Sequence, residues 1–186
     1  MFNYGSFKLF LFKVSIGALF VLFSSFLLLS FISYSPNDPG FGKFNLNVKI
    51  ENYFGFFGAI ASSFMVVVLG TSSVVIPLYI FYVGIFFALG KKTRFIFTKF
   101  FLIILTVVIF NFSINIQGIA VLQTGLLSKI ILDISYFYFP FLEIAFLYRL
   151  LIGIFGFIIS FFSLMFSFSL GLGFLKNFLF NFFYFV

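Results

Sequence analysis

The sequence predicts an all-α membrane protein with four transmembrane helices, further interfacial helices and a single domain over residues 1–186. The chain is 63% hydrophobic and only 8% charged, whereas a soluble domain carries about 25% charged residues. Its apolar residues also form runs long enough to cross the hydrocarbon core of a bilayer, which requires roughly 20 helical residues. The lipid bilayer is therefore the expected surrounding of most of the chain.

The first predicted span covers residues 9–32 and ends at the sequence FISYSPNDPGFGKF. The residue before a proline is disfavoured in helical conformation, so Pro36 and Pro39 indicate a firm helix end followed by a loop. Within this loop, the Asp38 carboxylate is expected to accept hydrogen bonds from the backbone amides of its own turn, between Pro36 and Gly40.

The next apolar block, Tyr53–Leu89, is too long for one span, since it would measure roughly 55 Å as a helix. It forms either a hairpin of two short spans that turns at Gly70–Ser73, or an interfacial segment over about 52–65 followed by a span over 66–89. The charge distribution favours the second interpretation, in which Pro77 would kink the span.

A third span is predicted over 95–112, and its lack of glycine suggests that it faces lipid. The stretch 121–139 is amphipathic and is expected to lie in the interface plane, where Lys129 and Asp133 are spaced for an ion pair. Pro140 ends this helix, and the fourth span covers 146–170. The apolar face of the interfacial helix contains Leu126, Leu127, Ile130, Ile131 and Ile134.

The positive charges predict the topology, because cytoplasmic loops are enriched in Lys and Arg. Most of the 11 basic residues fall before the first span, between the second and third spans, or after the fourth. Both termini are therefore expected to be cytoplasmic, and the net charge of +7 reflects topology. The predicted cytoplasmic anchor is the cluster Lys91, Lys92, Arg94 and Lys99.

Small residues recur at spacings that allow close helix packing in lipid. In the second apolar block these residues are Gly55, Gly58, Ala59 and Ser63, and in the fourth span they are Gly153 and Gly156. Packing within the chain is the favoured interpretation. Self-association into a homo-oligomer is the alternative.

The composition excludes several kinds of chemistry, since the chain contains no Cys and no His. Thiolate nucleophiles and imidazole bases are absent, and neither a metal-ligand set nor a pair of catalytic carboxylates is found. The sequence Gly84–Thr93 is similar to a phosphate-binding loop but has the wrong glycine spacing and places Lys92, not Ser or Thr, after Lys91. No catalytic activity, cofactor or metal is expected.

The residues Tyr34, Pro36, Asp38 and Pro39, at the end of a first span, resemble the N-terminal four-span (4TM) domain of the FtsK/SpoIIIE DNA translocases. Gly40 stands where this family more commonly has Ser. The resemblance extends over about residues 10–170, and its further matching positions are Asn52, Gly55, Gly58, Ala59 and Pro77.

This resemblance implies a membrane anchor in the bacterial inner membrane, at the division septum, for a motor that moves chromosomal DNA. The implied partners are membrane proteins of the division machinery. DNA would be contacted only through a motor domain that is absent from these residues or separate. The alternative function is a small transporter or channel subunit, which the lack of charged residues within the spans disfavours; a third is a membrane scaffold unconnected with division.

Overall fold

The computed structural model describes residues 4–43, 49–91, 95–119 and 123–170, and within them the chain forms helices and no strand. Four helices are long and apolar enough to cross a membrane. They are α1 (Tyr4–Ile32, with its span from Phe7), the 3₁₀ turn η2 (Thr71–Val74) continued by α3 (Val75–Ala88), α4 (Ile96–Ile116) and α7 (Phe146–Ser167). The predicted class, an all-helical membrane protein with four spans, is confirmed.

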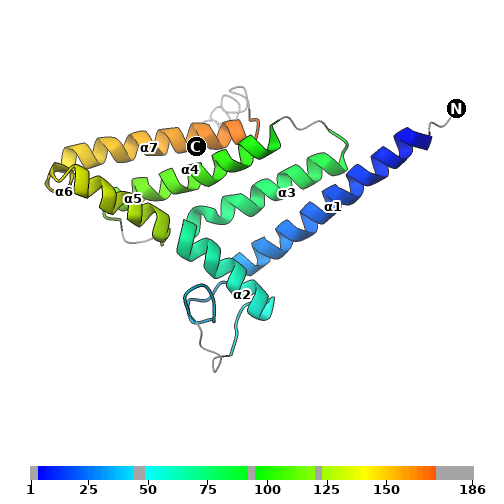
Figure 1. The fold of residues 1–186 in the computed structure, drawn as a ribbon, viewed down its shortest axis with the longest axis horizontal. Helices are drawn as coiled ribbons and strands as arrows, with labels where there is room; N and C mark the ends of the chain where they lie inside the picture. Colours follow the sequence, from blue (N-terminus) through cyan, green and yellow to red (C-terminus); the bar gives the residue numbers. More distant parts are fainter. Residues whose placement is uncertain (1–3, 44–48, 92–94, 120–122, 171–186) are drawn as a thin grey trace, which may run out of the picture.

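Shorter helices gather at one end of these spans (Figure 1). Helix α2 runs across the end of α1, and α5 lies beside the last part of α4. These shorter elements are α2 (Gly55–Phe64), its π-helical continuation η1 (Met65–Leu69), α5 (Gly125–Tyr138) and α6 (Phe141–Ile144). The opposite end holds the beginning of α1, the end of α3, the beginning of α4 and the end of α7.

The second apolar block bends at Gly70, not at Pro77 as expected. Gly70 has φ +93°, a conformation that glycine adopts without steric cost. Pro77 lies in the first turn of α3, directly after the 3₁₀ turn, where a missing backbone N–H is better tolerated than in a helix interior. Gly55–Leu69 is a shorter apolar helix, and the candidate span begins only at Thr71.

The four spans lie side by side in the order α1, α3, α4, α7, as a single layer (Figure 1). Helix α1 packs along α3 and α4 packs along α7. The two pairs meet at a core contributed by α3 and α4: Ile76, Tyr79, Val83, Ile103 and Val107. The accessible surface is 12747 Å². A compact protein of this mass is expected to have a smaller surface, about 9,100 Å².

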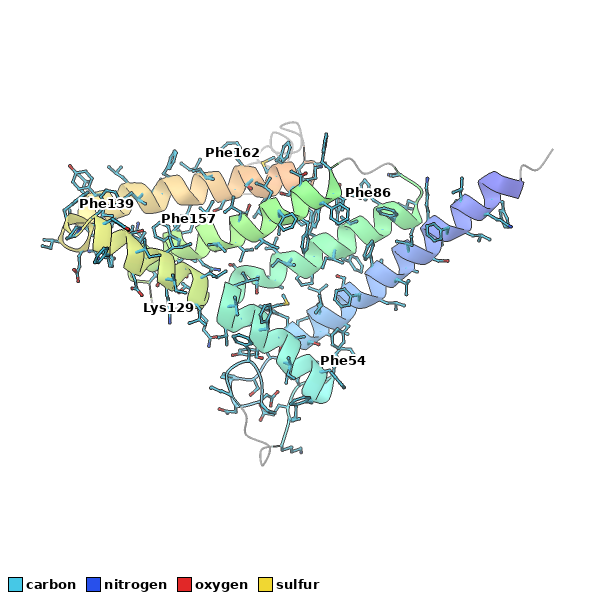
Figure 2. All side chains as sticks on the ribbon, viewed as in Figure 1. Phe54, Phe86, Lys129, Phe139, Phe157 and Phe162 are labelled. Carbon is cyan, nitrogen blue, oxygen red and sulfur yellow. The ribbon has the colours of Figure 1, made fainter. Side chains whose placement is uncertain are left out.

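Apolar side chains cover this large surface. Phe139 and Phe162 project outward (Figure 2) and are each 54% exposed. On α5, the predicted apolar face remains exposed, and the buried positions are Gly125 and Ser128. Such surfaces require lipid as their solvent. Lys129 and Asp133 were expected to form an ion pair. The described part of the chain contains no such ion pair, and both side chains are exposed.

The third span, predicted over 95–112, is longer in the structure and packs more extensively against its neighbours than expected. Helix α4 continues to Ile116, because Asn111 and Ser113 find carbonyl partners at Leu69 and Ile109. It also packs against α3, α5 and α7, while Phe97, Phe101 and Leu105 remain exposed on its free face. Two helices can approach closely when only one of them has small residues at the contact. At the α4–α7 contact, the glycines are on α7.

Candidate functional site

The loop between α1 and α2 is held by the carboxylate of Asp38, which is only 5% exposed. One carboxylate oxygen accepts the backbone N–H of Glu51 at 2.9 Å, and the other accepts that of Asn52 at 3.0 Å. The expectation that Asp38 bonds the amides of its own turn is therefore wrong. The carboxylate instead closes the loop by joining its beginning to its end.

Asn52 continues this connection into the helices. Its side-chain amide donates to the carbonyl of Ser30 in α1 at 2.8 Å, and its oxygen accepts the backbone N–H of Phe54 at 3.1 Å. Ser62 of α2 lies within 3.4 Å of the same amide nitrogen. Asn52 is 5% exposed, so these bonds form in a largely water-free place where an unpaired amide would be costly. Asp38 and Asn52 together fix α2 against the end of α1.

The other residues of the predicted turn have structural roles around this connection. Pro39 is fully buried, whereas Pro36 is exposed and its carbonyl accepts a bond from the Lys43 ammonium at 3.0 Å. Tyr34 is half-buried, and burial raises the pKa of its phenol. All lie in one loop with Asp38.

Gly40 is explained by its contact with α2. A Cβ at this position would overlap the hydroxyl of Ser63, and that hydroxyl accepts the backbone N–H of Phe41 at 2.8 Å. The loop therefore lies directly on α2 here. A serine at position 40 would not fit without a shift of one of the two segments.

The small residues of α2 serve packing within the chain, with one exception. Ala59 is 1% exposed, and a Cβ on Gly58 would overlap the Asn52 side chain. Gly55, however, has φ +58° and open space around it. It forms the turn into α2 and does not take part in the packing within the chain.

The glycines of α7 pack against α4. A Cβ on Gly153 would overlap the Gln117 amide, and a Cβ on Gly156 would overlap the Ser113 hydroxyl. The Gln117 amide also donates to the carbonyl of Arg149 at 2.8 Å. These positions are therefore occupied inside the molecule, which agrees with the favoured interpretation.

Two further glycine contacts were missed. Gly17 of α1 faces Gly84 of α3, and Gly70 touches the backbone at Gly125. Gly84 has a second small residue at helical spacing, Ala88, which also contacts Gly17, and this signal was overlooked. Gly17 has no small residue three or four positions away. Gly125 has φ +76°, which the sequence alone does not reveal.

Of the basic cluster, Lys91 and Lys99 are described, while Lys92 and Arg94 lie outside the described residues. The Lys91 ammonium lies over the Phe86 ring, 5.2 Å from its centroid. The Lys99 ammonium donates to the Ser169 hydroxyl and lies 5.7 Å from the Phe166 ring centroid. Both lysines are at the end of the spans opposite to α2 and α5.

Nothing in the described ranges has the geometry of a catalytic centre. No group of three or more Asp or Glu side chains able to hold a metal is found there. Several hydroxyls within the spans bond to carbonyls, as between Ser24 and Pro77, or to one another, as between Thr106 and Ser163. The buried hydroxyl of Ser72, at the start of the second span, has no hydrogen-bond partner among the described residues. The arrangement of these groups can hold helices together, so their role is structural.

A family model described as the 4TM region of DNA translocase FtsK/SpoIIIE matches residues 11–176. No curated protein and no solved structure gives a significant match.

Proposed function

This chain belongs to the family of 4TM regions of the FtsK/SpoIIIE DNA translocases, and on that premise we propose that it anchors a translocase at the division septum. The match over residues 11–176 carries the proposal. This family region is a membrane anchor and not the motor, and the described residues contain four candidate spans. Its location is the bacterial inner membrane, and its partners are membrane proteins of the division machinery.

The arrangement of the spans supports anchoring over transport. A transporter or channel surrounds a route for its solute, commonly with ionisable groups inside the membrane. Here the four spans form a single layer. Their described charged residues lie near one end of each helix, Lys8 and Lys13 in the first third of α1 and Lys99 and Arg149 in the first turns of α4 and α7. DNA translocation is assigned to a motor domain outside these residues.

The small residues that pack within the chain also bear on self-association. The contacts of Gly58, Gly153 and Gly156 are already filled by side chains of the same chain. Partners in the division machinery would therefore contact the exposed apolar surfaces of the layer or its loops. Homo-oligomers, if formed, would use those same surfaces.

The proposal is tested by expressing residues 1–186 with a fluorescent protein fused at the C-terminus. We expect fluorescence to concentrate at the division site without any motor domain. A membrane protein of similar size with four unrelated spans, fused in the same way, serves as the control and should be uniform. A uniform distribution of both fusions, together with solute flux through proteoliposomes containing the chain, would contradict the proposal and favour a transporter or channel subunit.

A further inference from the structure

A cavity of about 560 Å³ opens between η1, α4 and α5. Its apolar lining includes Val66 and Val67 of η1 and Leu126 of α5, and its polar lining includes Asn115 of α4 and Lys129 of α5. Its size lies within the range of small-molecule sites. A ligand that fits it must combine an apolar part with a group that a cation and an amide bind.

The cavity lies where the spans end. Asn115 is in the last turn of α4, which ends at Ile116. On its other side, the backbone N–H of Thr71, at the start of the second span, donates to the carbonyl of Gln123 at 2.8 Å. The ends of membrane-spanning helices lie where the hydrocarbon core meets the lipid headgroups, and the cavity is expected at that depth.

The polar groups of the cavity have binding capacity to spare. Lys129 is exposed and forms no ion pair with a described residue (Figure 2). Asn115 is half-buried, and its side-chain amide makes one long hydrogen bond, 3.5 Å, to the Ser128 hydroxyl. One of its two N–H groups therefore remains available. An ammonium and an amide N–H are donors suited to the oxygens of a phosphate.

We propose that this cavity binds the phosphate group of an anionic phospholipid. Lys129 pairs with the phosphate, and Asn115 donates a hydrogen bond to it. The beginning of the acyl chains lies against Val66, Val67 and Leu126, and continues along the exposed apolar face of α5. These apolar walls favour a lipid over free phosphate, which would gain nothing from them. The inference does not depend on the septal function.

The test uses a single tryptophan at the edge of the cavity, because the chain contains no Trp. Leu126 is 45% exposed, so L126W is expected to fold. The full chain is purified in neutral detergent with phosphatidylcholine, and phosphatidylglycerol with brominated acyl chains is titrated in. We expect half-maximal quenching at a roughly fivefold lower mole fraction than with brominated phosphatidylcholine, the preference that one lysine gives for anionic lipid.

Charge variants in the L126W background locate the site. Lys129→Gln should abolish the preference for phosphatidylglycerol, and Lys129→Arg should keep it. Lys49→Gln, which removes an exposed cation from the α1–α2 loop, should leave it unchanged. Equal quenching by both lipids, or a preference that survives Lys129→Gln, would overturn the proposal. If millimolar inorganic phosphate relieves the quenching, the site binds free phosphate, and the proposal that the bound phosphate belongs to a lipid is overturned.

Discussion

Replacement of Asp38 tests how the α1–α2 loop is held. Asp38→Ala removes the acceptors of two backbone N–H groups, those of Glu51 and Asn52. The Asn52 bond is buried, so its donor is left unsatisfied at a cost of about 1–3 kcal/mol. The Glu51 bond is partly exposed, so water replaces the acceptor and the loss is about 0.5–1.5 kcal/mol. We expect the free energy of loop opening to fall by about 1.5–4.5 kcal/mol.

Asp38→Asn distinguishes this arrangement from an ordinary turn cap. At a cap, Asn replaces Asp well, because one oxygen is sufficient. In this loop both carboxylate oxygens are used, so the amide NH₂ of Asn would face a backbone N–H, donor against donor. We therefore expect Asp38→Asn to lower the opening free energy by at least half as much as Asp38→Ala.

The assay is hydrogen exchange of the peptide covering residues 49–54, measured by mass spectrometry on the chain in detergent micelles. Each 1.4 kcal/mol corresponds to a factor of ten, so Asp38→Ala should accelerate exchange roughly tenfold to a thousandfold where opening is a rapid equilibrium. Asn37→Ala is the control, because Asn37 is exposed in the same turn. Wild-type exchange in Asp38→Asn, or equal rates for Asp38→Ala and Asn37→Ala, would refute the reasoning.

Two further predictions concern topology and helix packing. The chain has no native Cys, so single cysteines can report the topology. An impermeant thiol reagent should label Asn37→Cys in intact cells and Lys91→Cys only after permeabilisation, because the lysine-rich end is expected to be cytoplasmic. The reverse labelling pattern would show that the topology is the opposite of the one expected. Gly156→Leu should destabilise the chain in detergent by about 1–3 kcal/mol or more, since any side chain at this position overlaps Ser113. The control Phe155→Leu, at a 65% exposed position, should change the unfolding midpoint little. Equal shifts of the midpoint in both variants would contradict the α4–α7 contact.

The fold class was predictable because span length and hydropathy are local properties of the sequence. The partners of Asp38 were not, because they lie 13 and 14 residues further along the chain. Their identity depends on how the intervening loop closes. A buried aspartate between two prolines indicates a hydrogen-bonded turn, but it does not indicate which amides are bonded.

The small residues show the same limit in another form. Their spacing predicted close contacts, and Gly58, Gly153 and Gly156 make them. Gly55 has the same spacing from Ala59 but is required for its positive φ. Spacing alone does not separate a glycine that removes a side chain from one that permits a backbone conformation. Likewise, the absence of glycine from α4 did not indicate exposure, because its partner helix supplies the space.

The polar residues inside the spans specify helix pairing. In lipid, apolar surface gives little drive for one helix to choose another, so small residues and interhelical hydrogen bonds carry more of the selection. On the α4–α7 contact, the hydroxyls of Thr106 and Ser163 lie 2.5 Å apart, and Ser160 donates to the Thr106 carbonyl at 3.4 Å. On the α1–α3 contact, Ser24 donates to the Pro77 carbonyl at 2.5 Å.

Each of these bonds fixes the register of one antiparallel pair, and each uses a hydroxyl that would otherwise be free within the membrane. A solute route needs polar groups that face an open path and exchange partners as the solute passes. Hydroxyls committed to helix carbonyls and to one another do not provide such a path. These hydroxyls therefore specify how the helices of the layer pair, and this role agrees with an anchoring function.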